Sequence, residues 1–289
     1  MQALSRNMAE KWLCGRFEFD LKRPILMGIV NVTPDSFSDG GQHAQTDTAI
    51  QHALKLVDEG AVILDIGGES TRPGALPVSV QDELARVIPV LKAVLHSGVA
   101  ISVDTCKPEV MQAALDAGAD IINDVRGMRD PAAQRIVARH GHCGVCLMHM
   151  QGEPRTMQVQ PHYEDVLSDV RDELLHQALS LQQQGVQASR ISLDPGLGFG
   201  KTVEQNYHLL ANLEILVKTG YPVVLGASRK SMIGAITGRT VDQRMPGSIA
   251  AALAGVMHGA RILRVHDVKE THDALAVWQA VLDSENKNS

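Results

Sequence analysis

The chain alternates between short apolar runs and longer stretches in which apolar residues recur at helical spacing. Residues 25–31 form an unbroken apolar run, typical of a strand buried on both faces. The run stops at Asn31, and the polar, turn-forming residues that follow it indicate a loop. The same unit of strand and polar loop recurs along the chain. We expect further strands at 62–66, 100–104, 120–124, 144–148, 190–194, 223–226 and 261–265.

Helical periodicity separates these runs, and one proline interrupts it. Pro89 suggests a kink or a break in the second helix. The expected helices cover 47–59, 80–96, 108–117, 131–140, 163–184, 203–218, a region starting near 228 that is broken at 237–244 and resumes at 246–258, and 269–283.

Eight strands that alternate with helices predict an α/β protein with a (β/α)8 TIM barrel. An open doubly wound sheet is the alternative, although such sheets usually have fewer repeats. We expect a single domain over residues 1–289, with residues 1–24 as a short lead-in or hairpin that covers the bottom of the barrel.

Composition agrees with one large domain, since 289 residues is a common length for such a barrel. Apolar residues make up 44% and aromatic residues only 3%, so the core should be aliphatic. The net charge of −6 is spread along the chain without a basic block, which argues against a nucleic-acid partner. Neither a secretory signal nor an apolar run of membrane-spanning length is present, and we expect a cytoplasmic protein with no membrane partner.

Four cysteines raise the question of a metal or redox site, because Cys143 and Cys146 are only three residues apart. A second pair, or a pair that opens a helix, would support such a site. Here the pair falls in the strand expected at 144–148, where residues three apart face opposite sides. We interpret them as buried thiols.

Polar side chains follow each apolar run, and in a barrel of parallel strands they would converge on one mouth. A single Asp, Asn or Ser at such a position can also be the cap of the next helix. Lys230, Arg264 and His266 cap no helix start, so capping does not account for the whole set. The set comprises Asn31, Asp65, Glu69, Arg72, Asp104, Asn123, Asp124, His149, Asp194, Ser228, Lys230, Arg264 and His266.

Three of these residues suit a flat heterocycle with an amino-pyrimidinone edge. The carboxylates of Asp104 and Asp194 can accept paired hydrogen bonds from such an edge, and Asn123 can both donate and accept. Lys230 can donate to a ring carbonyl or nitrogen. The glycines of 194–201 lack the spacing of a nucleotide-binding loop, so we interpret this stretch as a flexible turn that brings Asp194 close to a planar ligand.

The remaining residues suit a phosphate group and its metal ion. Arg72, Arg264 and His266 are candidate cations for a phosphate, which TIM barrels often bind near their last strands. Asn31 offers a neutral oxygen that could complete the shell of a Mg2+ ion held by diphosphate and water.

Eight segments together resemble the dihydropteroate synthase family. The first is Asn-Val-Thr-Pro-Asp-Ser-Phe-Ser-Asp-Gly-Gly at 31–41, and the second is Gly-Gly-Glu-Ser-Thr-Arg-Pro-Gly at 67–74. The chain departs little from the family pattern, with Ala227 in place of a bulkier residue and Cys106 where a hydroxyl residue is common. The other six segments are 102–105, 122–124, 147–150, 194–201, 228–231 and 264–267, in the family's order.

The resemblance implies a transferase of folate biosynthesis that condenses 6-hydroxymethyl-7,8-dihydropterin diphosphate with 4-aminobenzoate, giving 7,8-dihydropteroate and diphosphate. It also implies a Mg2+ cofactor, inhibition by sulfonamides and a homodimer. The implied catalytic residues are Asp104, Asp194 and Lys230, and Asn31 is the implied metal ligand. The implied substrate-binding residues are Thr71, Arg72, Asp104, Asn123, Asp194, Ser228, Lys230, Arg264 and His266.

The bond to diphosphate is expected to break before the amine attacks, in a dissociative (SN1-like) substitution, because the methylene cation is delocalised over the ring. Two other functions remain possible. A pterin-dependent methyltransferase of the corrinoid type would share the fold and the pterin pocket, but it needs no cations for diphosphate. A non-catalytic paralogue that binds pterin or phosphate would need no complete set of site residues, and fold alone does not distinguish it.

Overall fold

The computed structural model describes residues 9–33, 42–70, 74–152, 157 and 161–286. Its main sheet has eight parallel strands in the order β8-β7-β6-β5-β4-β3-β10-β9. The two ends of this sheet meet, because Leu193 of β8 bridges Val223 and donates to the Pro222 carbonyl over 2.9 Å. The predicted (β/α)8 barrel is therefore confirmed. Its strands are β3 (Ile25–Asn31), β4 (Ile63–Gly67), β5 (Ala100–Asp104), β6 (Ile121–Asp124), β7 (Gly144–Met148), β8 (Ile191–Asp194), β9 (Val224–Leu225) and β10 (Ile262–Val265).

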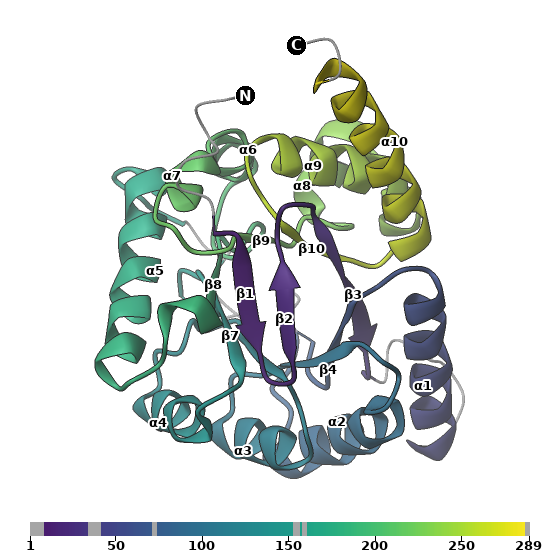
Figure 1. The fold of residues 1–289 in the computed structure, drawn as a ribbon, viewed down its shortest axis with the longest axis vertical. Helices are drawn as coiled ribbons and strands as arrows, with labels where there is room; N and C mark the ends of the chain where they lie inside the picture. The colour runs from purple at the N-terminus through teal and green to yellow at the C-terminus, as the bar shows by residue number, and fades with distance from the viewer. Residues whose placement is uncertain (1–8, 34–41, 71–73, 153–156, 158–160, 287–289) are drawn as a thin grey trace.

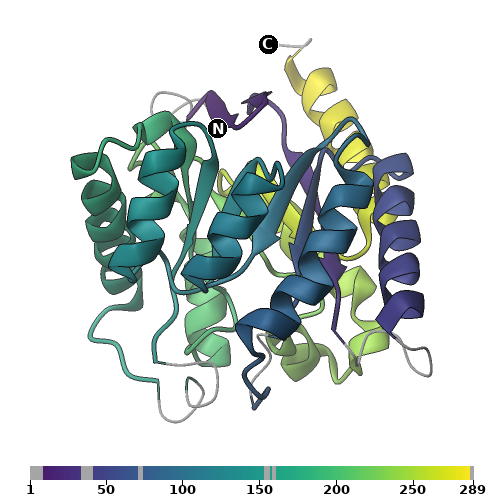
Figure 2. The ribbon, with the colours of Figure 1, turned by 90° about the horizontal axis from the view of Figure 1, so that it is seen from below.

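Helices surround this sheet as a ring (Figure 1), and they run beside the strands when the barrel is seen from the side (Figure 2). Each strand carries aliphatic side chains toward these helices, which forms an aliphatic core between the two layers. The helices are α1 (Gln42–Asp58), α2 (Val80–Val94), α3 (Pro108–Asp116), α4 (Pro131–His140), α5 (Val166–Gln183), α6 (Val203–Ala211), α7 (Glu214–Val217), α8 (Ser231–Thr237), α9 (Met245–Met257) and α10 (Val268–Asn286).

Two helices differ from the sequence-based expectation. Pro89 lies inside α2, which stays one continuous helix rather than breaking. The single helix expected over 203–218 is instead two, because α6 ends at Asn212. The side chain of Asn212 donates back to the His208 carbonyl over 2.8 Å and helps to stop the helix there.

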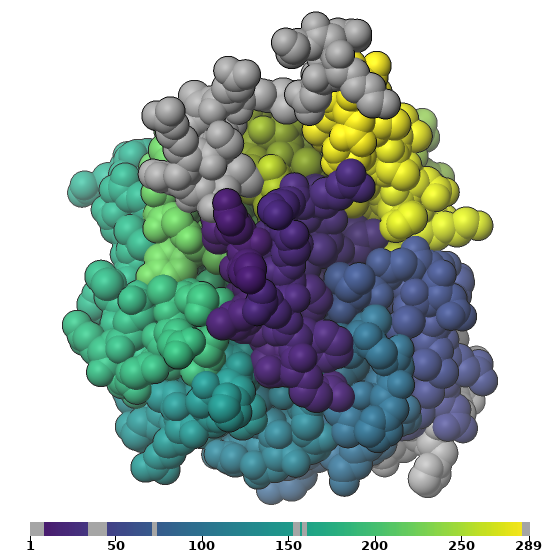
Figure 3. Space-filling view, viewed as in Figure 1, coloured from purple at the N-terminus to yellow at the C-terminus, as the bar shows by residue number. Residues whose placement is uncertain are grey.

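A two-stranded hairpin covers the amino-terminal end of the barrel. It consists of β1 (Lys11–Cys14) and β2 (Phe17–Asp20), drawn in purple in Figures 1 and 3. Trp12 is fully buried there, and its indole nitrogen donates to the Arg190 carbonyl over 3.0 Å. The hairpin packs on inward side chains from the starts of the strands, among them Met27. With this end closed, only the carboxyl ends of the strands remain for a ligand.

The four cysteines are unpaired thiols, and Cys143 and Cys146 are buried as expected. Cys143 and Cys146 are both fully buried, and burial raises the pKa of each thiol. A protonated, inaccessible thiol is a poor metal ligand and a poor nucleophile. Within the described part of the chain, no cluster of His, Cys, Asp and Glu is able to hold a metal ion, and no helix is long and apolar enough to cross a membrane.

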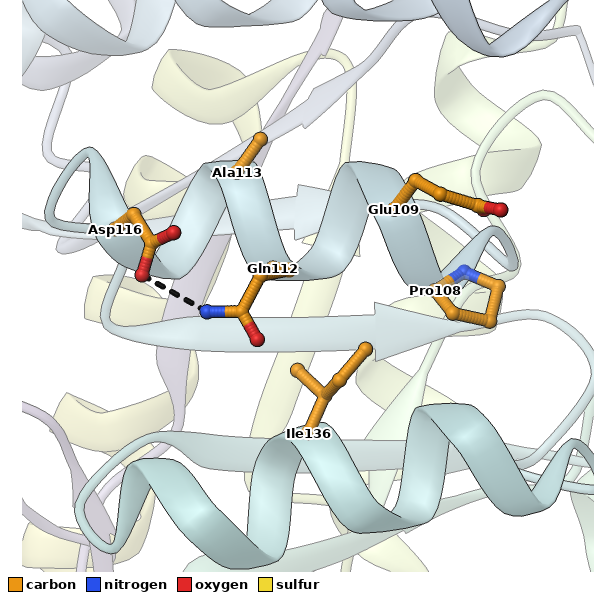
Figure 4. Close-up of a pocket in the computed structure, with 6 residues that line it drawn as sticks. All are labelled: Pro108, Glu109, Gln112, Ala113, Asp116 and Ile136. Atoms are coloured by element: carbon orange, nitrogen blue, oxygen red, sulfur yellow. Dashed lines mark hydrogen bonds between the residues drawn. The ribbon is translucent and has the colours of Figure 1, made fainter.

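A groove of about 440 Å³ lies on the outer wall, between α3 and α4 (Figure 4). Ile136 of α4 points toward Gln112 of α3, and Gln112 donates to Asp116 over 2.8 Å. None of the polar residues at the strand ends lines this groove, so it belongs to the helical surface rather than to the barrel mouth.

Candidate active site

Strand register places three of the expected site residues at one level of the barrel mouth. Asn31 pairs with Gly67, Gly67 with Asp104, and Asp104 with Asn123. Paired residues on neighbouring parallel strands point to the same face, and here that face is the interior, where Asp104 meets Arg264. Gly67 adds no side chain at this level, where a Cβ would lie 3.6 Å from Asp104 Cβ.

Asp65 is the centre of a buried hydrogen-bond network one level below this ring. Its carboxylate accepts from Arg264 Nε over 2.6 Å, from Ser102 Oγ over 2.6 Å and from Asn123 Nδ2 over 3.1 Å. Asp65 is fully buried, and a buried carboxylate without hydrogen-bond partners would destabilise the fold. The network fixes the orientation of Asn123 and Arg264 before any ligand binds.

Arg264 joins two carboxylates at the mouth. Its Nε is bonded to Asp65 and its Nη2 donates to Asp104 over 2.7 Å. Asp267, which is a possible rim partner by sequence distance alone, is paired instead with Arg229. Burial acts to lower the pKa of the Arg264 guanidinium, but Asp65 and Asp104 outweigh it and raise that pKa, so the cation is permanent.

Burial raises the pKa of Asp104 to about 7, and Arg264 opposes this rise. His266, by contrast, is not the cation that the sequence suggested. Its ring Nδ1 lies 3.0 Å from Ser228 Oγ, and burial together with the nearby Arg264 charge lowers its pKa to about 3. At neutral pH His266 is an uncharged hydrogen-bonding group beside Ser228.

Asp194 ends β8, and Lys230 lies after β9. The loop at 194–201, the glycine loop, contacts both of them. The Asp194 carboxylate accepts from the Gly196 amide over 2.7 Å, and burial raises its pKa. Lys230 Nζ lies 3.9 Å from the centre of the Phe199 ring, a cation–π contact. Burial lowers the pKa of Lys230 to about 7, so the amine is easily neutralised.

The glycine loop is not the flexible turn expected from the sequence. Gly196 has a φ of 64°, and a Cβ there would lie 1.9 Å from the His149 carbonyl oxygen. The loop is mostly buried, and Lys201 at its end is only 2% exposed. Glycine serves here for close backbone packing, and it gives the loop one fixed shape.

The structure thus brings together most of the expected site. Arg264 bonds Asp104 directly and is linked to Asn123 through Asp65. The glycine loop joins Asp194 to Lys230, a hydrogen bond joins Ser228 to His266, and register places Asn31 at the same mouth. Thr71 and Arg72 lie outside the described residues. Sequence reasoning missed the roles of Asp65 and Lys201. A carboxylate inside the apolar run 62–66 was the available signal for Asp65.

Eight parallel strands with carboxylates and basic side chains gathered at their carboxyl ends define a TIM-barrel protein with a polar mouth of both charges, suited to a flat polar ring that carries an anionic group. A family model for pterin-binding enzymes matches residues 27–266, so the chain belongs to the pterin-binding enzyme family.

Within that family it belongs with the dihydropteroate synthases. The dihydropteroate synthase of Neisseria meningitidis serogroup C is 53% identical over 274 residues, which is 93% of this chain and 97% of that protein. The Escherichia coli K12 enzyme is 49% identical over 270 residues, or 93% and 95% of the two chains. The Burkholderia cenocepacia enzyme, solved in complex with 7,8-dihydropteroate, superposes with a TM-score of 0.89 at 49% identity, covering 97% of this chain and 99% of that one.

Proposed function

We propose that this barrel mouth condenses 6-hydroxymethyl-7,8-dihydropterin diphosphate with 4-aminobenzoate to form 7,8-dihydropteroate and diphosphate. The observation that carries this assignment is the pair of carboxylates at the carboxyl ends of β5 and β8, the largely buried Asp104 and the buried Asp194, at a mouth that also holds Arg264. A neutral planar ring with N–H donors can satisfy both carboxylates at once.

Pterin recognition is assigned to four side chains. Asp194 accepts hydrogen bonds from the amino-pyrimidinone edge, and Asn123, oriented by Asp65, both donates and accepts. Asp104 accepts from the other side of the ring, and Lys230 donates to a ring carbonyl or nitrogen. These contacts hold the exocyclic methylene toward the amine, which supplies orientation rather than a chemical base.

The substitution is dissociative. The bond between the methylene carbon and the diphosphate oxygen breaks first, and its electron pair leaves with diphosphate. The two carboxylates stabilise the cation that remains, which is spread over the ring. The arylamine nitrogen then donates its lone pair to the methylene carbon, and its extra proton passes to water.

Anion binding is assigned to Arg264, His266 and Arg72, the last of which lies outside the described residues. Arg264 is a permanent cation and neutral His266 contributes a hydrogen bond rather than a charge. Ser228, next to His266, is assigned to the carboxylate of 4-aminobenzoate together with Thr71. Sulfonamides mimic this arylamine, and we propose that they bind at the same position.

A magnesium ion fits these donors if the diphosphate of the substrate supplies part of its ligands. Asn31 is a neutral oxygen donor at the mouth, on the same level as Asp104, and the described residues hold no acidic cluster to bind the ion without substrate. Diphosphate would supply the anionic ligands. When bound, the ion neutralises charge on the departing diphosphate.

We further propose a homodimer that forms through α9 and α10, which lie side by side in Figure 1. These helices expose large apolar side chains, since Met257, Val277 and Val281 are each at least half exposed. A second copy of the chain would bury them. We place the protein in the cytoplasm, where its four free thiols would stay reduced. Residues 1–289 are proposed to form one domain.

The decisive experiment is a coupled assay for diphosphate release from the pterin substrate, with and without 4-aminobenzoate. Product formation that requires both substrates supports the assignment. A methyltransferase would release no diphosphate, and a non-catalytic paralogue would bind pterin without any turnover.

A further inference from the structure

Lys201 ends the glycine loop and is buried behind the pterin side of the mouth. Its ammonium group lies 3.0 Å from the Gly196 carbonyl, 3.0 Å from the Phe199 carbonyl and 2.9 Å from His149 Nδ1. The His149 carbonyl is a fourth, longer partner at 3.4 Å. An ammonium group has three protons, so the three short contacts use all of them.

A chain of polar contacts continues from Lys201 toward the surface. Because His149 Nδ1 accepts from Lys201, the ring proton is on Nε2, which lies 3.2 Å from Glu173 Oε2. Glu173 also accepts from Arg129, and Arg129 donates to the Met150 carbonyl over 2.6 Å. Lys201 therefore joins the loop after β8 directly to His149 after β7, and Glu173 of α5 joins His149 to Arg129.

The carbonyls that Lys201 holds belong to the residues that position Asp194 and Lys230. The amide of Gly196 donates to Asp194 Oδ1 over 2.7 Å, so the placement of Gly196 sets the orientation of that carboxylate. The centre of the Phe199 ring lies 3.9 Å from Lys230 Nζ, so the placement of Phe199 helps to set the position of that amine.

We propose that Lys201 is a positioning residue for pterin binding, acting through the glycine loop on Asp194 and Lys230. This inference rests on the proposed function, which assigns pterin recognition to those two side chains. Lys201 touches neither the ring nor the reacting carbon in this account, and its contribution is to keep the two groups in a binding geometry before the substrate arrives.

The loop has other attachments that should preserve its overall path without Lys201. Tyr163 donates from its hydroxyl to the Gly200 carbonyl over 2.7 Å, and Asn206 Oδ1 accepts from the Gly198 amide over 2.6 Å. Both bind the outer part of the loop. Loss of Lys201 should therefore release mainly Gly196 and Phe199, the part that faces the pterin.

A buried cation can also be purely structural, and Arg190 is the matched control for that role. It is 3% exposed and donates to the carbonyls of Cys143 and Val137, at 2.7 and 3.1 Å. It lies at the hairpin-covered end of the barrel, beneath Trp12, and touches no residue of the mouth.

The test compares Lys201→Met and Arg190→Met in the full chain. Binding of 6-hydroxymethylpterin is measured by calorimetry, and KM is measured separately for the pterin diphosphate and for 4-aminobenzoate. We expect Lys201→Met to weaken pterin binding about ten-fold or more and to raise the pterin KM, with less than a three-fold change in the KM for 4-aminobenzoate. Arg190→Met should lower the melting temperature and leave pterin binding within about two-fold.

His149 supplies a second test should Lys201→Met fail to fold. His149→Leu removes the acceptor of Lys201 and should weaken pterin binding, whereas His149→Asn keeps an oxygen close to the position of Nδ1 and should restore most of it. Wild-type pterin affinity in a folded Lys201→Met chain, or in His149→Leu, would overturn the inference. So would an equal loss in Arg190→Met.

The proposed function fails in a different way. In that case the unmodified chain binds no pterin, or Asp194→Ala binds it as well as the unmodified chain does. Lys201 is judged only against a wild type that binds pterin and an Asp194→Ala chain that does not.

Discussion

Arg264 Nη2 lies 2.7 Å from Asp104 Oδ2, so the central cation of the mouth already pairs with one of the carboxylates assigned to the pterin. The same guanidinium holds the buried Asp65 through Nε. Arg264 therefore has two functions before any phosphate arrives. It holds the side chains of Asp65 and Asp104 in place and opposes the rise that burial causes in the pKa of Asp104, and its planar fork suits a phosphate group.

Arg264→Lys tests both functions. A lysine keeps the charge but cannot bridge Asp65 and Asp104 with the spacing of a guanidinium fork. We expect affinity for 6-hydroxymethylpterin to fall by about 1 kcal/mol, and affinity for its diphosphate to fall further, by about 1–3 kcal/mol in all. Calorimetry with both ligands on one purified variant measures the difference. Equal losses for the two ligands would show that Arg264 shapes the mouth and does not bind phosphate.

Asp194→Ala should remove pterin binding without unfolding the protein. The ring edge loses its acceptor, which costs about 1–3 kcal/mol of binding free energy. Burial raises the pKa of Asp194, so the folded state bears a cost for its charge, and the melting temperature should stay close to that of the wild type. Calorimetry and a thermal melt on the same sample check this. Full affinity for the pterin in the folded variant would refute the assignment.

The barrel itself could be predicted from the sequence because its strands are buried on both faces. Such strands give unbroken apolar runs, and the run at Gly144–Met148 matches the observed strand at both ends. The β9 strand is the weakest case, with only Val224 and Leu225, because the register there leaves few paired residues. Boundaries set by a single side-chain contact, such as the end of α6 at Asn212, have no comparable signal.

The site could be predicted only as far as strand ends and residue types allow. Asn31, Asp104 and Asn123 follow from the rule that the carboxyl ends of parallel strands meet at one mouth. The partners of Arg264 could not be derived, since Asp65 is 199 positions away and no pattern encodes the pair. Lys201 was missed for a different reason. Two of its three short contacts are to main-chain carbonyls, and these are present at every residue.

Lys230→Met should stabilise the protein at neutral pH while it abolishes activity. Burial lowers the pKa of Lys230 from 10.5 to about 7, so between these values the unfolded chain binds more protons than the folded one. This effect makes the free energy of unfolding rise with pH between about 7 and 10, and below about 7 the destabilisation by Lys230 is at its full, constant size. Methionine removes the destabilisation that comes from burying the amine. Since Lys230 keeps some contact with water, the free energy of unfolding at pH 7 should increase by about 1–2 kcal/mol.

Urea unfolding of wild type and Lys230→Met at several pH values measures this gain. The difference between the two proteins should shrink toward zero as the pH approaches 10. Lys218→Met is the control for loss of one positive charge, because Lys218 is exposed on the far side of α7 from the mouth. A difference that does not vary with pH would show that Lys230 carries no shifted proton equilibrium.

Gly196→Ala tests whether the glycine loop has one fixed shape. The φ of 64° is unfavourable for an alanine, and its Cβ would lie 1.9 Å from the His149 carbonyl oxygen. Gly185 is the matched control, since it has a φ of 92° with no atom near the position of a Cβ. Gly185→Ala should cost about 1 kcal/mol, the conformational penalty alone. Gly196→Ala should cost about 3 kcal/mol or more, because main-chain atoms must also move.

Denaturant unfolding measures the loss of stability in both glycine variants, and pterin binding gives a second readout. The His149 carbonyl that Gly196→Ala would displace also faces Lys201, at 3.4 Å, so the shift should reach Asp194 and weaken pterin binding. Gly185→Ala, in the turn after α5, should leave pterin binding unchanged. If the two variants lose the same stability and both bind pterin normally, the loop can move aside, and the fixed geometry described for Asp194 would be incorrect.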